Sequence, residues 1–298
     1  MTSSPLLVTG ASGHLGRLVL EYLIQEGRGP LIATSRSPEA LASFAARGVE
    51  VRRADFDDEA SLLPAFRGAK RALLISTDAL LEPGLRVRQH TTAIRALSAA
   101  GIEQVVYTSL ANAASSVVGL AKDHAETEAA LSNSDLGFTI LGNTVYADLE
   151  LAGLPRALAS GNLINARGDG KIAFVTRDDC AHVAAAALAD ENFRGRRTLN
   201  VTGPEALSSN EFAAVASACF ERPLKHVSIP LEALVAGMIE HGLPERLARI
   251  YASFDTAAAR GEFAEVTDTV RSLTGRAPQS MRDLLMKNRS LVLAQLGA

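Results

Sequence analysis

The sequence predicts an α/β protein: a doubly wound parallel sheet of the Rossmann type with a smaller, mostly helical C-terminal lobe. Two observations carry this prediction. Short apolar runs alternate with segments of helical periodicity as far as residue 142, and a glycine-rich loop follows the first run. The runs are apolar throughout, which is typical of parallel strands covered by helices on both faces. Right-handed crossovers between such strands produce a doubly wound fold.

The predicted elements of the first half follow one another without a long linker. Strands are expected over residues 5–9, 30–34, 49–55, 71–76, 104–109 and 137–142. Helices are expected between them, over residues 14–26, 37–48, 59–68, 84–100 and 121–133, from apolar residues spaced three and four apart. Strand and helix therefore alternate as in successive βαβ units.

The pattern loosens after about residue 150. One more strand is expected over residues 198–203, and helices over 208–220, 230–242 and 262–274. We predict a dinucleotide-binding domain over 1–150 and a substrate lobe over 151–298, with part of the lobe, about 176–203, returning to the main sheet. A cleft between the carboxyl edge of the sheet and the lobe is the expected ligand site.

Composition excludes several classes of protein. The chain has 298 residues, is 47% hydrophobic, and balances 30 basic against 33 acidic residues, so a nucleic-acid partner is not indicated. It shows neither a secretory signal nor a run of 18 apolar residues, so no membrane partner is expected. Two cysteines are too few for a disulfide framework or a zinc site. We expect a soluble, cytoplasmic protein acting on a small molecule; its oligomeric state is open, a homodimer being one option.

A glycine loop follows the first predicted strand. Gly10, Gly13 and Gly16 stand in the spacing G-x-x-G-x-x-G, directly before a helix. In a dinucleotide site such glycines allow a tight turn, close approach to the pyrophosphate and close packing of helix on strand. The helix N-terminus then presents N–H groups to the phosphates. The alternative is a tight turn with a structural role only.

The residues after the second predicted strand favour NADPH over NADH. NAD sites usually carry an acidic residue there, whereas this chain has Ser35 and Arg36, with no acid before Glu39. A guanidinium can bind a 2′-phosphate with two hydrogen bonds and stack on the adenine. A solvated surface arginine is the alternative. After the third strand, Asp55 is a candidate to bind the adenine amino group.

Several motifs in order resemble the NmrA-like atypical short-chain dehydrogenase/reductases, closest to the NADPH:quinone oxidoreductase 2 and triphenylmethane reductase group. They are "TGASGHLG", "SR", "ADFDDEASL", "LLIS", "YTSL" and "GLAKDHAETE", and later "GDGKIAFVTRDDCA" and "AEVTDTVRSLTGRAP". The resemblance covers nearly the whole chain, and its specificity comes from order and spacing. It implies a Rossmann fold, bound NADP(H) and oxidoreductase activity.

The resemblance also implies roles for individual residues. The matching positions are the phosphate loop (Gly10, Ser12, Gly13, His14, Leu15, Gly16), the 2′-phosphate arginine (Arg36), the adenine wall (Asp55, Phe56), the ribose and nicotinamide side (Leu74, Ile75, Ser76), the end of the fifth strand beneath the nicotinamide (Thr108, Ser109), and a loop beside nicotinamide and substrate (Asn143, Tyr146). The chain departs from the pattern at Gly142, where relatives commonly carry Arg, and at His14, where they often carry Gln.

The sequence lacks the tyrosine and lysine that extended short-chain dehydrogenases place four residues apart. Glu128 matches the glutamate that follows the lysine by four positions. His124 then stands in the lysine position and Leu120 in the tyrosine position. Shifting the register to Lys122 does not help, because residues 110–130 contain no tyrosine. The acid that reduction of a simple carbonyl requires is therefore missing.

Three functions compete on this evidence. The first is an NADPH-dependent oxidoreductase that transfers hydride to a quinone-like or other planar conjugated acceptor, which needs little help from an enzyme acid. The second is an NADP(H)-binding redox sensor without turnover. The third, a sugar-nucleotide epimerase or dehydratase, is disfavoured by the missing Tyr–Lys pair. We favour the first.

Three residues are candidates for catalysis. His124 could orient the nicotinamide ribose or relay a proton, or it could be a histidine on the helix surface. Asn143 could bind the nicotinamide amide or a substrate carbonyl, or it could be a turn residue after a strand. Tyr146 could stack on a flat acceptor or belong to the core. The spacing of the histidines and cysteines predicts no metal site.

Overall fold

The computed structural model describes residues 4–296 and contains one central sheet of seven strands. Their order is β3-β2-β1-β4-β5-β6-β9. The strands are β1 (Leu6–Val8), β2 (Leu31–Ser35), β3 (Glu50–Arg53), β4 (Arg71–Leu74), β5 (Gln104–Leu110), β6 (Gly137–Asn143) and β9 (Arg196–Val201). The registered pairs among β1 to β5 are all parallel. The order reverses between β1 and β4, which confirms the predicted doubly wound sheet.

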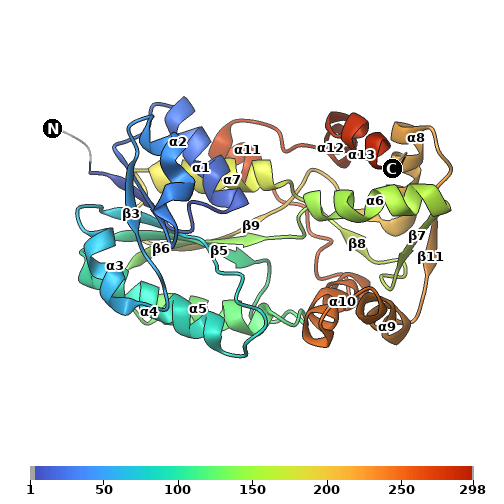
Figure 1. The fold of residues 1–298 in the computed structure, drawn as a ribbon, viewed down its shortest axis with the longest axis horizontal. Coiled ribbons are helices and arrows are strands. Elements are labelled where there is room, and N and C mark those ends of the chain that lie inside the picture. The colour runs from blue at the N-terminus through green and yellow to red at the C-terminus, as the bar shows by residue number, and fades with distance from the viewer. Residues whose placement is uncertain (1–3, 297–298) are drawn as a thin grey trace. The chain divides into compact units, whose positions relative to one another are not determined.

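Helices cover both faces of this sheet (Figure 1). The helices α3 (Glu59–Phe66), α4 (Leu85–Ala99) and α5 (Ala121–Ser132) lie on one face. The helices α1 (His14–Gln25), α2 (Ala42–Ala45) and α7 (Arg177–Ala189) lie on the other, and the short 3₁₀ turn η1 (Pro38–Leu41) leads into α2. With helices on both faces, β1, β2, β4 and β5 are buried along their whole length. Continuous burial explains why these strands are apolar runs.

The core on the α3–α5 face contains aromatic and aliphatic side chains from strands and helices. Phe66 of α3 and Tyr107 of β5 are fully buried. Each large apolar side chain removed from water contributes about 1.5–3 kcal/mol to folding. Tyr107 carries a hydroxyl into this core, and a buried hydroxyl requires a hydrogen-bond partner.

Contacts divide the chain into two compact units. The first contains the residues up to Ala113, with Lys122–Gly142 and Cys180–Leu199, and the second contains Ala114–Ala121, Asn143–Asp179 and the residues from Asn200 onward. The predicted division into a cofactor domain and a substrate lobe stays a prediction. Among the described residues, none of the helices combines the length and apolar character needed to cross a membrane.

The second unit is mostly helical, as predicted for the C-terminal lobe. Its helices are α6 (Asp148–Ser160), α8 (Ser209–Phe220), α9 (Leu231–Glu240), α10 (Glu245–Ala259), α11 (Thr269–Thr274), α12 (Met281–Lys287) and α13 (Arg289–Leu296). Two small sheets pair β7 (Asn162–Asn165) with β11 (Lys225–Ser228), and β8 (Lys171–Ile172) with β10 (Leu207–Ser208).

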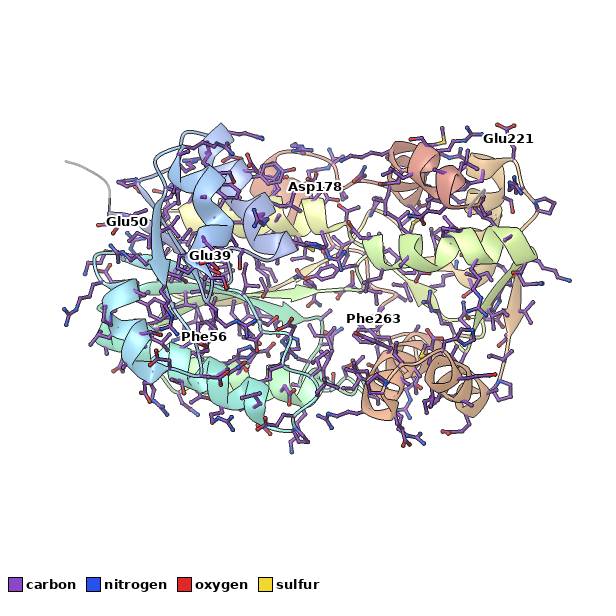
Figure 2. The ribbon with its side chains drawn as sticks, in the orientation of Figure 1. Glu39, Glu50, Phe56, Asp178, Glu221 and Phe263 are labelled. Atoms are coloured by element: carbon purple, nitrogen blue, oxygen red, sulfur yellow. The ribbon has the colours of Figure 1, made fainter. Side chains whose placement is uncertain are left out.

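The prediction of a helix over residues 262–274 is wrong for its first half. Gly261, at φ +78°, lies just past α10, and only Thr269–Thr274 is helical. Between them, the buried Phe263 accepts a hydrogen bond through its carbonyl from the N–H of Ala173, at 2.8 Å. Figure 2 labels Phe263. This tertiary hydrogen bond holds the segment in a non-helical conformation that local periodicity does not reveal.

Candidate cofactor-binding and catalytic site

The glycine loop connects β1 to α1. Gly10 has φ +60°, a left-handed conformation that glycine adopts without steric cost. Gly13 is the N-cap of α1, and its N–H donates to the carbonyl of Gly10 at 3.1 Å. Gly10, Gly13 and His14 are exposed. Because the first N–H groups of a helix have no acceptor within it, those of α1 are available to phosphate oxygens.

Gly16 shows that the loop is built for close packing. A Cβ atom at this position would lie 2.5 Å from the carbonyl oxygen of Gly10 and 2.7 Å from the Cα of Ala11. A Cβ at Gly10 would meet the side chain of Ile75, at 3.5 Å. The loop therefore lies close to Ile75, just past the end of β4, the strand next to β1 at the reversal of strand order. These residues fit a bound dinucleotide phosphate.

The end of β2 is joined to the glycine loop by a hydroxyl pair. The hydroxyl of Ser35 donates to that of Ser12 at 2.9 Å, and it accepts from the N–H of Ser37. Arg36 follows and is exposed. Arg17 of α1 also contacts the loop: its Nε donates to the carbonyl of Ser12 at 2.9 Å. Sequence reasoning missed Arg17, which has no place in the glycine pattern.

The proposed adenine wall lies after β3. Asp55 is half-buried, and its Oδ1 accepts from the N–H of Asp57 at 3.1 Å. The partly buried Phe56 packs against the core on the face covered by α3 and α4, where Figure 2 labels it. Asp58 is the N-cap of α3. The adenine contacts of Asp55 and Phe56 stay predictions.

The ends of β4 and β5 lie side by side and share hydroxyl contacts. The N–H of Ser76 donates to Oγ1 of Thr108 at 2.9 Å, and the N–H of Ile75 donates to Oγ1 of Thr9 at 3.2 Å. Ser109 donates to Oε1 of Glu128 at 2.5 Å. Burial raises the pKa of Glu128, and the Ser109 hydroxyl opposes that shift. The structure thus brings the predicted residues Ile75, Ser76 and Thr108 together.

His124 is buried rather than on the helix surface. It is 4% exposed, and both of its ring nitrogens have partners. The Nη2 group of Arg86 lies 3.0 Å from Nε2, and the hydroxyl of Tyr107 lies 2.9 Å from Nδ1. Arginine can only donate, so Nε2 accepts and the proton of the neutral imidazole is on Nδ1. The ring therefore donates to the oxygen of Tyr107.

This geometry opposes a proton-relay role for His124. Burial and the Arg86 guanidinium lower its pKa well below the ordinary value, because a second ring proton would point at another donor. Burial also raises the pKa of Tyr107. The catalytic role of His124 stays a prediction, and the contacts favour a fixed, neutral ring. Sequence reasoning missed Tyr107 and Arg86, which lie outside the Y-x-x-x-K window.

Asn143 and Tyr146 lie together in the second unit. Nδ2 of Asn143 donates to the Tyr146 hydroxyl at 3.1 Å, and the Arg177 guanidinium stands 5.2 Å from the centre of the Tyr146 ring. Asn143 is 4% exposed, yet its Oδ1 has no hydrogen-bond partner among the described residues. An unsatisfied buried acceptor is costly unless a ligand supplies a donor. Asn143 is thus suited to bind an N–H or O–H group.

The chain is similar to known proteins over most of its length. The NAD(P)H-binding family matches residues 10–191. Quinone oxidoreductase 2 of Escherichia coli is 34% identical over 279 residues, which is 93% of this chain and 96% of that protein. Its structure complexed with NADPH has a TM-score of 0.89 and covers 95% of this chain and 99% of that one.

Two further relatives extend the comparison. The triphenylmethane reductase of Citrobacter sp., complexed with NADP(H), is 30% identical with a TM-score of 0.88, covering 95% of this chain and 99% of that one. An NmrA-like family domain-containing oxidoreductase of Aspergillus flavus is 31% identical over 98% of both chains. The chain therefore belongs to the NAD(P)H-binding family of NmrA-like atypical short-chain dehydrogenase/reductases and is an NAD(P)H-dependent oxidoreductase.

Proposed function

We propose that the protein transfers hydride from NADPH to a quinone or another planar conjugated acceptor, and that solvent supplies the proton. The main observation supporting this proposal is that His124 is neutral and that both of its ring nitrogens are hydrogen-bonded. It occupies the lysine position of the missing Tyr–Lys pair, and Leu120 occupies the tyrosine position. The relatives named as a quinone oxidoreductase and a triphenylmethane reductase support an acceptor of this class.

The preference for NADPH is inferred from the end of β2. Arg36 is exposed directly after Ser35, and the next acidic residue is Glu39. A guanidinium there complements the 2′-phosphate of NADPH, whereas an NAD site would place a carboxylate on the ribose hydroxyl. Gly10, Gly13 and the N-terminus of α1 would hold the pyrophosphate.

When bound, NADPH supplies a hydride from its nicotinamide. The chain contributes positioning: Ile75, Ser76 and Thr108 would lie along the ribose and nicotinamide side. Asn143 would accept a hydrogen bond from the nicotinamide amide or from a hydroxyl of the reduced acceptor, and Tyr146 would stack on a flat ring. A quinone spreads the incoming negative charge over its conjugated system, so orientation contributes more than acid catalysis.

Steady-state kinetics tests the proposal. Purified protein should oxidise NADPH in the presence of simple benzoquinones or naphthoquinones, and should leave a saturated aliphatic ketone unreduced. Calorimetry with NADPH measures binding separately. If NADPH binds but no acceptor in a broad screen consumes it, the redox sensor without turnover replaces this proposal. A cytoplasmic location and a homodimer stay predictions of the sequence.

A further inference from the structure

The segment that follows β4 is held by side chains from three other elements. Ile75, Ser76 and Thr77 lie past the end of the strand, but the N–H of each donates to a side chain. The acceptors are Oγ1 of Thr9 on the loop after β1, Oγ1 of Thr108 on β5 and Nε2 of His90 on α4. A segment outside regular structure that keeps all three N–H groups bonded has a defined position.

Thr77 is bound on both sides of its peptide backbone. Its N–H lies 2.9 Å from Nε2 of His90, and its carbonyl accepts from Nε of Arg86 at 2.8 Å. Arg86 and His90 are four positions apart on α4, so they share one helix face. Arg86 is 4% exposed and His90 is fully buried. The two side chains together hold Thr77 against α4.

The same arginine also fixes α5. Its Nη2 group reaches His124, and His90 contacts α5 as well, through Oγ1 of Thr127 at 2.9 Å. Thr127 donates its own proton to the carbonyl of Asp123, so it accepts the Nδ1 proton of His90. The directions of these hydrogen bonds are therefore fixed: Arg86 donates to Thr77 and His124, and His90 accepts from Thr77 and donates to Thr127.

We propose that Arg86 is a positioning residue for the nicotinamide half of the cofactor, acting through Thr77 on Ile75 and Ser76. This inference rests on the proposed function, which places Ile75 and Ser76 along the ribose and nicotinamide side. The adenosine half would be held by the ends of β2 and β3, whereas these Arg86 hydrogen bonds go to Thr77 and His124. Loss of Arg86 should therefore weaken binding of the nicotinamide half of the cofactor and leave binding of the adenosine half unchanged.

The test compares two ligands, NADPH and 2′,5′-ADP, which lacks the nicotinamide. Calorimetry measures the Kd of both for the wild type, Arg86→Met and a control, Arg95→Met. Arg95 lies on the same helix with a side chain that is 60% exposed. We expect Arg86→Met to raise the Kd of NADPH about tenfold, the worth of one charged hydrogen bond, and to leave that of 2′,5′-ADP unchanged. Arg95→Met should change neither.

Arg86→Lys keeps the test decisive if the methionine variant does not fold. Lysine retains the charge and reaches one of the two acceptors, so the same ligand-dependent loss should be smaller. Equal weakening of both ligands, or of neither, would overturn the positioning role. A wild-type protein that binds 2′,5′-ADP but not NADPH would refute the proposed function as well as the positioning role. A wild type that binds neither ligand would refute the proposed function itself.

Discussion

The hydroxyl of Tyr107 lies 2.9 Å from Nδ1 of His124. The chain thus has a tyrosine beside the helix position where extended relatives keep a lysine, but on β5 and fully buried. Because His124 donates to the phenol oxygen and burial raises the pKa of Tyr107, this tyrosine is a poor proton donor. The pair stabilises the interior between β5 and α5.

Restoring the tyrosine and lysine of the extended relatives should not improve the enzyme. In Leu120→Tyr/His124→Lys, the new ammonium replaces a neutral ring that lies 3.0 Å from the Arg86 guanidinium. Two buried cations repel, so we expect a lower Tm and no rise in kcat with a naphthoquinone.

Leu120→Tyr alone is the control, because it adds the phenol and leaves the Arg86 contact in place. Thermal unfolding and steady-state kinetics measure both variants. A clear gain in kcat for the double variant would mean that a proton donor limits the wild type.

Acid should weaken the fold through the buried histidines. Burial and the Arg86 charge lower the pKa of His90 from 6.5 to about 3. Below about pH 6.5, His90 becomes protonated in the unfolded chain but stays neutral in the folded protein, so the free energy of unfolding falls as pH falls. The loss is about 1.4 kcal/mol per pH unit until the pH nears the folded pKa.

His90→Asn should flatten this dependence. Asparagine keeps a donor for Thr127 but cannot be protonated. Denaturant unfolding at a series of pH values should therefore show a smaller slope of unfolding free energy against pH between about pH 4 and pH 6. His241→Asn, at the exposed end of α9, is the matched control. An unchanged slope in His90→Asn would contradict the buried neutral state.

Arg36→Ala should change the choice of cofactor. Without the guanidinium, the 2′-phosphate loses its charged partner, so the KM for NADPH should rise about 10- to 100-fold while that for NADH changes little. Steady-state kinetics with both cofactors measures the difference. Arg88→Ala, which removes another exposed arginine, is the control. Equal effects on both cofactors would remove Arg36 from the 2′-phosphate site.

Asn143→Leu should separate stability from function. The substitution removes a buried Oδ1 that lacks a partner among the described residues, but also the hydrogen bond from Nδ2 to the Tyr146 hydroxyl, so the free energy of unfolding without ligand should fall by no more than about 1 kcal/mol. The KM for NADPH or for the quinone should rise about tenfold, because the acceptor for the ligand is lost.

Asn165→Leu is the matched comparison for Asn143. Asn165 is equally buried, but its side chain contacts Ser209, His226 and the N–H of Arg167. Its loss should cost at least about 2 kcal/mol of stability. Chemical denaturation and kinetics decide the matter: a large loss of stability in Asn143→Leu would indicate a structural role.

The sequence predicted the elements that carry strong local signals. The strands up to β6 and their helices were found because buried parallel strands are continuous apolar runs, and Gly10, Gly13 and Gly16 mark the loop after β1 by spacing alone. The second half was harder. The helix α10 was not predicted, and residues 262–268 were assigned to a helix although they are not helical, because the backbone contact of Phe263 is tertiary.

Local periodicity and turn chemistry therefore determined the fold class and the position of the glycine loop, and the sequence alone shows that residues 110–130 contain no tyrosine. Only the tertiary structure decided which side chains surround His124. Tyr107 is 17 residues from His124, and Arg86 is 38 residues from it, on another helix. Which protons a buried ring can hold depends on the donors packed around it, and those are brought together by strand order, which no local spacing encodes.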